Sequence, residues 1–520
     1  MGNAAAVLPG KSFKHITTKL TAHTLAPTPP SDARNILFVT SEFADLVKVG
    51  GLGDVSAALP RALAQHHDVR VLIPGYRQVI RSGLPIRVVG KLPGLGAIPP
   101  CLIGEITLPD QLIVHVVLCQ QLYDREGNPY GDSDGNDWPD SHIRFARLAL
   151  AAARIAEGQG IRNWRPDLVH ANDWPTGLTP AYMAWSGQQT PCIFTIHNLA
   201  YQGLCSKQSH IELGIPEHAL TSEGMEFYGD LSFLKAGINY ATQVTTVSQT
   251  YAHEITSTAF GCGLEGLLRR KANEGLLTGY VNGIDSSWQP RTDPRLIQGF
   301  APNDWQGKQA NTRYVERAFG FTEENAPLFA VVSRLVHQKG IDLTIATAEH
   351  IAAQGGRIAI IGQGERALEQ QVEALASRFP GRIGVNLKFC ETEARRIIAG
   401  SDFLLMPSRY EPCGLSQSYA QCYGSLPIAR RTGGLADTIE DGVTGFLFRE
   451  PTRESYLHAI DRALNVYRRP LLLNAMRCKA MAAPLYWHQS VGPYDRLYRR
   501  MIDREHIFAP SSRRALACAN

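Results

Sequence analysis

Lys48 and Asp54 flank a glycine-rich stretch in which charge and backbone freedom lie close together. The stretch reads “KVGGLGDV”, with Gly51 as the second glycine of the pair, and a segment with helical pattern follows it. A glycine turn that opens a helix offers backbone N–H groups and the positive end of the helix dipole, and both favour an anion or a sugar oxygen. A structural turn with a solvated lysine and aspartate has the same spacing, so this stretch alone leaves both interpretations open.

Arg334 and Lys339 lie in “SRLVHQKG” (333–340), directly after a predicted strand. In open α/β sheets, ligands bind beyond the carboxyl ends of the strands. Two cations at one strand end suit a diphosphate, because arginine offers a bidentate fork and lysine a point charge. Taken by itself, such a pair is more typical of a solvated surface, so this motif needs support from the others.

Glu411 belongs to “MPSRYEPCGLSQSYAQC” (406–422), which also follows a predicted strand. Gly414 permits a close approach of the backbone, and helical pattern begins directly after it. The amides of Leu415 and Ser416 are therefore expected to point at a phosphate. Glu411 has no cation beside it in the sequence, so we expect it either to cap the helix or to accept hydrogen bonds from sugar hydroxyls.

Two more motifs end predicted strands, “HANDWPTG” (170–177) and “TIHNLAYQG” (195–203). His197 in the second motif is a candidate metal ligand, but no second histidine or cysteine follows at ligand spacing. A lone histidine is more often a hydrogen-bonded structural group. No metal site is predicted. A P-loop is also missing, and a dinucleotide fingerprint does not follow the first strand, where “SEFADLVKV” intervenes.

The elements that position these motifs are short, continuous apolar runs, which are typical of strands buried on both faces of a parallel sheet. Segments with helical pattern alternate with them, for example 141–158 and 340–356, and this alternation predicts doubly wound α/β domains. The series breaks around 281–327, where “VNGIDSSWQPRTDP” predicts a hinge. The predicted strands are 35–40, 69–74, 112–117, 167–171, 192–196 and 244–248 in a first series, and 328–333, 357–362, 402–407 and 426–430 in a second.

The composition of the 520 residues excludes several classes of protein. A net charge of +4 with 44% hydrophobic residues is ordinary for a soluble enzyme and gives no reason to expect a nucleic-acid partner. No stretch approaches the ~18 consecutive apolar residues of a membrane helix, so no membrane association is expected. The 10 cysteines are scattered without a C-x-x-C pair, which favours free thiols in a reducing compartment.

The first 31 residues form an unusual leader that contains lysines and threonines but no Asp or Glu. Such a leader is compatible with an organelle transit segment or with a disordered bacterial extension. Arginine is missing before Arg34, which favours the bacterial extension and a cytoplasmic location; a transit peptide would place the protein in the plastid stroma.

Taken together, the motifs resemble those of the bacterial glycogen synthase family, which also contains starch synthase. The resemblance implies a GT-B fold, with two facing Rossmann-like, doubly wound α/β domains and the active site in the cleft between them. It also implies transfer of glucose from ADP-glucose to the non-reducing end of glycogen or another α-1,4-glucan, with retention at the anomeric carbon and without a cofactor or metal. The motifs are “KVGGLGDV”, “HANDW”, “TIHNLAYQG”, “SFLKAG”, “VNGID”, “VSRLVHQKG”, “PSRYEPCGLSQ” and “RRTGGLADT”, in the family's order over about 34–500.

The resemblance also orders the domains. A flexible leader (1–32) is followed by the acceptor-side catalytic domain (33–280) and the nucleotide-sugar-binding domain (281–485). A last helix (486–506) is expected to return to the first domain, and a flexible tail (507–520) ends the chain.

Roles for individual residues follow from the same resemblance. Arg334 and Lys339 would neutralise the leaving ADP, and Lys48 would join them from the first domain; mutual repulsion of these cations is expected to hold the empty cleft open. Phe389 stands where the family often has an aromatic residue that stacks on adenine. The catalytic set is Asp173, His197, Arg334, Lys339 and Glu411, and the substrate-binding set is Lys48, Gly51, Asp54, Tyr130, Asn198, Asn282, Phe389, Cys413, Gly414, Leu415 and Ser416.

One departure from the family pattern falls beside the site. The family usually reads “HAHDW”, whereas this chain has Asn172, which puts a role of that second histidine in doubt. Two alternatives remain open at this point: a plastid starch synthase, and a catalytically inactive glucan-binding regulator. The sequence does not decide between ADP-glucose and UDP-glucose, and it predicts no oligomeric state.

Overall fold

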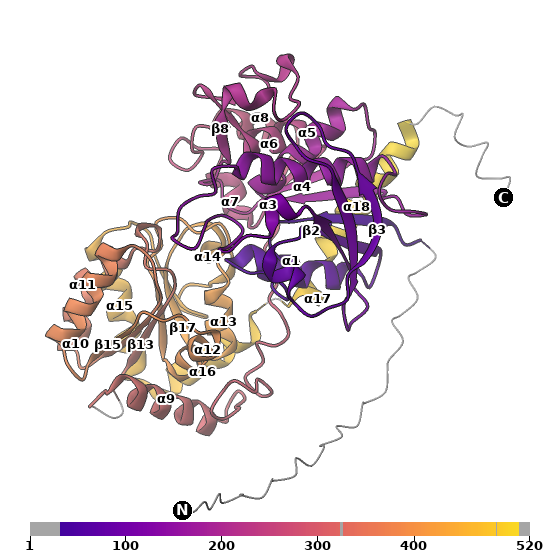
Figure 1. Cartoon of the computed structure of the whole chain (residues 1–520). Coiled ribbons are helices and arrows are strands. Elements are labelled where there is room, and N and C mark those ends of the chain that lie inside the picture. The colour runs from indigo at the N-terminus through magenta and orange to yellow at the C-terminus, as the bar shows by residue number, and fades with distance from the viewer. Residues whose placement is uncertain (1–31, 323–325, 485, 509–520) are drawn as a thin grey trace, which may run out of the picture.

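A computed structural model describes residues 32–322, 326–484 and 486–508, and it contains two α/β domains joined side by side (Figure 1). The strands of one large sheet lie between Asn35 and Gly279, and those of the other lie between Leu328 and Phe448. The predicted leader up to residue 31 and the predicted tail from residue 509 lie outside the described residues.

The first domain is built on a nine-stranded sheet with the order β12-β11-β7-β6-β1-β2-β5-β4-β3. From β12 to β5 all strands are parallel, and the chain reverses its winding direction between the neighbouring strands β1 and β6. Such a reversal opens a crevice at the carboxyl ends of the two strands, where ligands bind in open α/β sheets. The strands are β1 (Asn35–Val39), β2 (Asp68–Pro74), β3 (Arg87–Leu92), β4 (Cys101–Thr107), β5 (Ile113–Leu118), β6 (Leu168–Asn172), β7 (Cys192–Ile196), β11 (Gln243–Thr246) and β12 (Leu277–Gly279).

Two strands of this sheet depart from the expected parallel pattern. β3 and β4 pair antiparallel with each other, and β4 pairs antiparallel with β5. The side chains of β4 alternate between buried and exposed positions, as in Leu102 and Ile103, and those of β3 are exposed or half-buried up to Leu92. Both strands therefore lack the continuous apolar run on which the strand predictions depended. A small antiparallel sheet beside the main one was also not predicted; its strands are β8 (Leu204–Ser206), β9 (Glu226–Phe227) and β10 (Asp230–Ser232).

The second domain has a six-stranded parallel sheet with the order β15-β14-β13-β16-β17-β18. Its reversal point lies between β13 and β16. The loops that follow these two strands carry the arginine–lysine motif and the Glu411 motif, so the topology brings both motifs to one crevice. The strands are β13 (Leu328–Val332), β14 (Arg357–Ile361), β15 (Ile383–Asn386), β16 (Phe403–Met406), β17 (Leu426–Arg430) and β18 (Phe446–Phe448).

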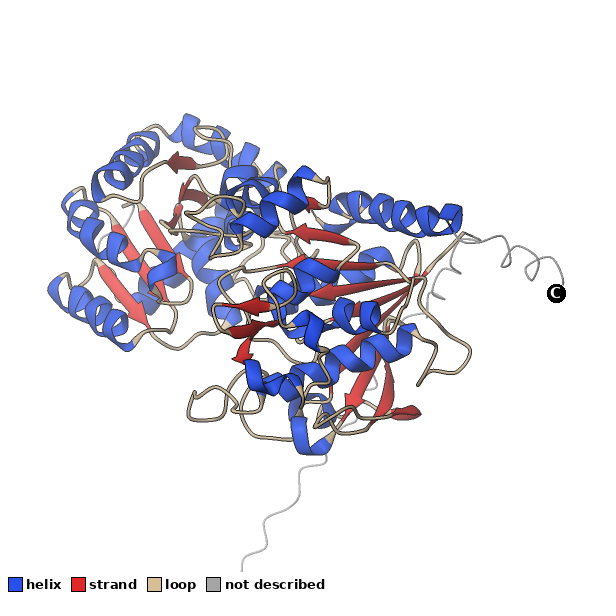
Figure 2. Cartoon of the chain, turned by 90° about the horizontal axis from the view of Figure 1, so that it is seen from above, coloured by secondary structure: helices blue, strands red, loops and turns tan. Residues whose placement is uncertain are grey.

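Helices cover the faces of both sheets, which explains why the central strands are apolar throughout (Figure 2). In the first domain they are α1 (Gly51–Leu63), α2 (Arg77–Ile80), α3 (Gln120–Tyr123), α4 (Ser141–Ala156), α5 (Leu178–Trp185), α6 (Phe233–Tyr240), α7 (Gln249–Glu254) and α8 (Glu265–Asn273). In the second they are α9 (Gln306–Phe319), α10 (Ile341–Ala353), α11 (Arg366–Arg378), α12 (Glu391–Gly400), α13 (Ser416–Cys422), α14 (Gly433–Thr438), α15 (Arg453–Tyr467) and α16 (Pro470–Ala482).

The chain then returns to the first domain through α17 (Trp487–Ser490) and α18 (Gly492–Phe508). Trp487, Tyr494 and Tyr498 are buried in the hydrophobic core of the first domain, although the residues of that core that precede Trp487 lie more than 200 positions earlier in the sequence. In the described part of the chain, no helix combines the length and the apolar character that crossing a membrane requires.

Candidate active site

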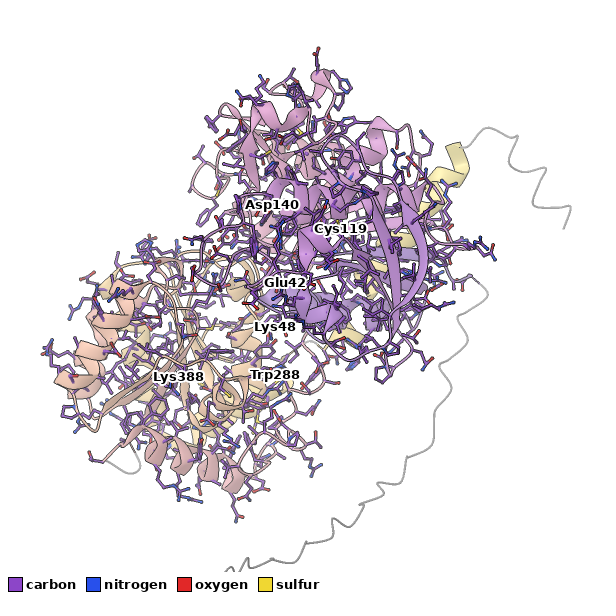
Figure 3. All side chains as sticks on the ribbon, viewed as in Figure 1. Glu42, Lys48, Cys119, Asp140, Trp288 and Lys388 are labelled. Carbon is purple, nitrogen blue, oxygen red and sulfur yellow. The ribbon has the colours of Figure 1, made fainter. Side chains whose placement is uncertain are left out.

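A buried carboxylate that the sequence analysis did not single out organises the glycine-rich loop. Glu42 follows β1, is only 3% exposed, and accepts hydrogen bonds from the amides of Val49 (2.7 Å) and Gly50 (2.8 Å). Tyr130 donates its hydroxyl proton to the other carboxylate oxygen of Glu42 at 2.7 Å and lies 3.0 Å from the Ser41 hydroxyl. Figure 3 places Glu42 and Lys48 on the side of the first domain that faces the second.

This carboxylate corrects the expectation for the glycine stretch. α1 begins at Gly51, so the loop does open a helix as predicted, but Glu42 already occupies the amides of Val49 and Gly50. The Glu42 carboxylate therefore accepts hydrogen bonds from two of the backbone N–H groups that were expected to bind a ligand. Tyr130 is likewise engaged inside the domain, where burial raises the pKa of its hydroxyl well above the usual value, with the Glu42 charge adding to the effect.

Lys48 and Asp54 form an ion pair across the first turn of α1, with 2.7 Å between Nζ and Oδ1. Burial raises the pKa of Asp54, and the Lys48 charge opposes that shift. Lys48 thus has a carboxylate partner of its own, which the expected mutual repulsion with the cations of the second domain did not include, and that repulsion stays a prediction.

Asp173 has a strained backbone at the end of β6. Its φ of 60° and ψ of 175° lie in a region that residues other than glycine rarely adopt. The conformation is held by its amide, which donates to Thr195 O at 2.8 Å, and by its carboxylate, which accepts from the Trp174 amide at 2.9 Å. Burial raises the pKa of the Asp173 carboxyl to about 7, with the Glu42 charge acting in the same direction. Strain combined with a perturbed acid is typical of a functional position.

Asn172 fixes the orientation of His197. The amide nitrogen of Asn172 donates to Val39 O (3.1 Å) and His170 O (3.2 Å), so its Oδ1 faces the Nε2 atom of His197 at 3.0 Å. Nε2 of His197 must therefore carry the proton, which leaves a lone pair on Nδ1. Burial lowers the pKa of His197 to about 3, so the ring is neutral at physiological pH. Asn172, where this chain departs from the family pattern, thus fixes the ring of His197.

Lys339 and Glu411 meet across the crevice of the second domain, with 2.5 Å between Nζ and Oε2. The Ser408 hydroxyl donates to the same carboxylate oxygen at 3.1 Å. Glu411 is buried, and its cation partner lies 72 positions away rather than beside it in the sequence. No side chain of a described residue caps α13, so the expectation that Glu411 caps this helix is wrong. Arg334 lies at the end of β13 and is exposed.

Glycines let the backbone segments of this crevice approach one another. Gly340, directly after Lys339, has a φ of 67°, and a Cβ there would lie 2.1 Å from Pro407 O. Gly414 has a φ of 68°, and a Cβ at Gly433 would lie 1.9 Å from Glu411 O. Both loops that carry charged residues therefore require glycine for their shape.

The two domains bring their motifs together at their junction. Gly51 of α1 faces Leu415 of the second domain, since a Cβ at Gly51 would lie 3.9 Å from the Leu415 Cδ1 atom. Nearby, the Ser248 hydroxyl donates to Pro412 O at 2.6 Å, and Glu254 accepts from the Thr432 hydroxyl at 2.9 Å. The start of α1 and the start of α13 thus lie opposite each other.

The remaining predicted residues lie around this junction in different settings. The backbone N–H of Asn198 donates to the carboxylate of Asp173. Asn282 and Cys413 are buried side by side, and burial raises the pKa of the Cys413 thiol to about 12. Among the described residues, the buried Oδ1 atom of Asn282 has no hydrogen-bond partner. Phe389 is 57% exposed, so the face of its ring is accessible to a planar ligand.

Two surface hollows of about 900 and 480 Å³ lie elsewhere on the molecule, around Lys91–Gln121 and Arg431–Thr444. Neither is lined by a predicted site residue. Within the described ranges, no group of three or more His, Cys, Asp or Glu side chains is placed to hold a metal ion.

Comparisons with known proteins agree with this arrangement. The family model “Starch synthase catalytic domain” matches residues 35–270, and “Glycosyl transferases group 1” matches residues 314–476. The chain is 64% identical over 474 residues to the glycogen synthase of Pseudomonas aeruginosa, which covers 91% of this chain and 92% of the relative. It is 64% identical over 471 residues to the glycogen synthase of Pseudomonas syringae pv. syringae, with 91% and 97% coverage.

A solved structure extends the comparison to the fold. The catalytic domain of starch synthase IV from Arabidopsis thaliana, bound to ADP and acarbose, matches with a TM-score of 0.80 and 29% identity over 91% of this chain and 100% of that one. The two domains thus form the GT-B fold of a glycosyltransferase. The chain belongs to the glycogen synthase family, and its function is that of a glycogen synthase rather than of an inactive regulator.

Proposed function

We propose that the protein transfers glucose from ADP-glucose to the non-reducing end of an α-1,4-glucan, with retention at the anomeric carbon. The observation that carries the proposal is the opposition of Gly51 and Leu415, which sets the donor-side motifs of the two domains face to face. The starch synthase IV structure is bound to ADP and acarbose, which supports a nucleoside diphosphate and a glucan as the ligands of this protein.

The second domain supplies the charge that the leaving group needs. Breaking the bond between glucose and phosphate places negative charge on ADP, and Arg334 and Lys339 lie at the strand ends where it would develop. The amides of Leu415 and Ser416 at the start of α13 add further donors, and Gly414 lets them approach the phosphate. Glu411 holds Lys339 in place and accepts hydrogen bonds from the sugar. Phe389 stacks on the adenine.

The first domain supplies the polar groups that hold the sugar. The protonated fraction of Asp173, the free Nδ1 atom of His197 and the Asn198 side chain can each bond a glucose hydroxyl, and together they fix the ring as the anomeric centre becomes positive. Lys48, paired with Asp54, lies on the side of the first domain that faces the second. The Oδ1 atom of Asn282 is buried without a partner among the described residues, and it would accept a hydrogen bond from a hydroxyl of the donor once the donor reaches it.

Retention follows if the acceptor attacks on the face from which ADP departs. The hydroxyl at the non-reducing end then forms its bond to the anomeric carbon while the bond to ADP breaks, and a phosphate oxygen takes the proton of the hydroxyl. This route needs no enzyme nucleophile and no metal. The bacterial origin of the relatives supports a cytoplasmic enzyme over the plastid alternative.

The direct test incubates the purified protein with glycogen and either ADP-glucose or UDP-glucose carrying a labelled glucose. We expect the label to enter glycogen from ADP-glucose far faster than from UDP-glucose, without added metal and in the presence of a chelator. Digestion with exo-acting enzymes specific for α-1,4 bonds should then release the label. Binding of glycogen without any transfer would contradict the proposal, as would a product with β-linked glucose.

A further inference from the structure

Two cysteines face each other across the antiparallel edge of the first domain. Cys101 is the first residue of β4, and Cys119 directly follows the last residue of β5 (Figure 3). The two strands pair without a register shift as far as Leu102 and Leu118, so Cys101 and Cys119 are the next opposed positions. Both cysteines are free thiols. Opposed positions on neighbouring strands project their side chains from the same face of the sheet.

The hydrogen-bond pattern of the two strands makes this a closely spaced position. At the closed end of the hairpin, the Leu108 amide donates to Leu112 O at 3.0 Å, which marks a hydrogen-bonded pair. Such pairs alternate with non-hydrogen-bonded pairs along an antiparallel ladder, so Cys101 and Cys119 form a non-hydrogen-bonded pair. The Cα atoms of such a pair lie about 4.5 Å apart, within the range of about 4.4–6.8 Å that a disulfide bridges.

Both cysteines are also held in place by groups outside the ladder. Arg147 of α4 donates from Nη1 to Pro93 O (2.9 Å) and to Pro99 O (2.8 Å), which fixes the segment that leads into Cys101. The carbonyl of Cys119 accepts from two amides of α3, at 3.1 and 3.0 Å. Two groups that are fixed in this way lose little conformational freedom when a bond joins them.

A hollow gives small molecules access to the two thiols. Cys101 is 5% exposed and Cys119 is 6% exposed, and both line the hollow of about 900 Å³ on the first domain. A hollow of this size is large enough for a small organic molecule. Lys91 lines it as well and offers a positive charge to an acidic molecule. Oxidised glutathione, a small disulfide with several carboxylates, has the chemistry that suits this hollow.

The two thiols differ in how readily they ionise. Burial raises the pKa of Cys101 to about 11; the Arg147 charge opposes this shift, and Cys119 adds to it. Burial also raises the pKa of Cys119, but the Leu122 amide and the charges of Arg147 and Arg125 oppose that shift. Cys119 is therefore the better attacking thiol. Because neither thiolate is strongly stabilised, the reduced form gains little, which favours the disulfide once it has formed.

We propose that Cys101 and Cys119 are a redox pair that a low-molecular-weight disulfide converts into an intramolecular disulfide bond, which ties β4 to the start of α3. The Cys119 thiolate attacks one sulfur of the small disulfide, forms a mixed disulfide and releases one small thiol. The Cys101 thiolate then attacks the Cys119 sulfur, forms the bond between the cysteines and releases the second small thiol. The cysteines lose two electrons and two protons, and the small disulfide takes up both. The proposal does not depend on the proposed function.

The experiment equilibrates folded wild type in a buffer that contains reduced and oxidised glutathione in equal amounts. Free thiols are then blocked by alkylation, and mass spectrometry of the unreduced digest identifies the linked peptides. We expect more than half of the chains to contain the bond between Cys101 and Cys119, and dithiothreitol should remove it. The oxidised protein should melt about 5 °C above the reduced protein, because the bond restricts the unfolded chain.

Single substitutions are the matched controls. Cys101→Ser should leave Cys119 joined to glutathione, Cys119→Ser should leave Cys101 unmodified, and neither variant should melt higher after oxidation. The exposed Cys262 and Cys390 should carry glutathione in all three proteins and so report that the oxidant has reacted. Unlinked Cys101 and Cys119 in wild type whose exposed cysteines have reacted would overturn the proposal, as would a bond that lowers the melting temperature. Glutathione on Cys101 in Cys119→Ser would overturn the order of attack.

Discussion

The two domains contribute unlike halves to the candidate site. On the first domain, Glu42 and Asp173 are almost completely buried, and the acid and imidazole of Asp173 and His197 have strongly shifted pKa values. On the second domain, Arg334 and Phe389 are exposed, and the charge of Lys339 is already balanced by Glu411.

The difference reflects the two kinds of ligand group. A sugar is neutral and must be held by hydrogen bonds of fixed direction, which requires side chains locked in a dry environment. A diphosphate is bound by electrostatic attraction, which acts over longer distances than a hydrogen bond and does not require a rigid loop. This attraction becomes stronger when water is excluded from the site. Under the proposed function, we therefore expect the first half to be prepared in advance and the second half to gain strength when ligand and domains come together.

Substitution of the cations should have the largest effect on turnover. Lys339→Ala and Arg334→Ala should each lower kcat by about 10² to 10³, as does the loss of one donor that stabilises developing negative charge. The KM for the glucan should change little. Steady-state kinetics with ADP-glucose measures this, and Arg366→Ala, an exposed arginine at the start of α11, is the control. Wild-type turnover in both variants would show that the charge-based half is misassigned.

A double-mutant cycle sharpens this comparison. If Lys339 acts on the diphosphate directly, Glu411→Gln should lower activity by a different route, and the double variant should lose more than either single one. If Lys339 serves only to hold Glu411, the losses should not add. The cycle thus decides whether the second half binds through charge or through a positioned carboxylate.

Removal of the Asp173 charge should change the pH dependence of stability. A folded pKa of about 7, against 3.8 in the unfolded chain, means that the native state binds the proton more tightly, so the contribution of Asp173 to stability falls as pH rises from about 4 to 7. The substitution Asp173→Asn removes this pH-dependent loss of stability, because asparagine does not ionise. Relative to wild type, the variant should gain about 2 kcal/mol in unfolding free energy between pH 5.5 and 8, and it should lose activity.

Urea unfolding at several pH values gives this difference directly. If the difference in unfolding free energy between wild type and Asp173→Asn is the same at every pH from 5.5 to 8, Asp173 is ionised in the native state throughout this range. The first half of the site would then be less dry than its burial indicates.

Asn172→Asp should disturb the locked imidazole. A carboxylate 3.0 Å from Nε2 favours the protonated ring and raises the pKa of His197, which removes the free lone pair on Nδ1 at neutral pH. The profile of kcat/KM against pH should shift upward, with activity recovered at higher pH. The surface change Asn465→Asp is the control, and identical profiles for both variants would separate His197 from catalysis.

Gly51→Ala should have the smallest effect and a mixed one. Alanine favours a helix over glycine by about 0.5–1 kcal/mol, and the Cβ meets only Leu415 at an ordinary contact distance, so unfolding by urea should show equal or greater stability. The Cβ nevertheless projects into the junction, so donor KM should rise. Gly51→Val should raise it further, and more than Lys48→Ala, whose ammonium is paired with Asp54. An unchanged donor KM in Gly51→Val would place the donor elsewhere.

The central strands were predictable because burial on both faces leaves a direct trace in the sequence. “CIFTI” and “LPIAR” coincide with β7 and β17 to the residue. β3 and β4 were missed because one of their faces is exposed, and β8 to β10 because two or three residues are too few for any periodic signal. Strand order and winding direction, which place the crevices, depend on pairings between distant segments.

The motif residues of the site were predictable, but most of their partners were not. Glu42 lies in no glycine-rich or charged motif, and its partners are 7, 8 and 88 positions away. Lys339 and Glu411 do lie in motifs, but their pairing across 72 positions was not predictable. Ion pairs and hydrogen bonds between residues so far apart in the sequence arise from the fold. A single sequence therefore indicates the residues of the site but not which of them pair with one another.

The return of the chain end to the first domain has a consequence for synthesis of the protein. Tyr498 of α18 lies 2.6 Å from the Nδ1 atom of His170, and Asp495 lies 2.9 Å from His67. Both histidines are made hundreds of residues earlier, and the whole second domain is synthesised before their partners. The core of the first domain is therefore incomplete until the second domain has been made, and β6, which precedes Asp173, gains the support of α18 only after that.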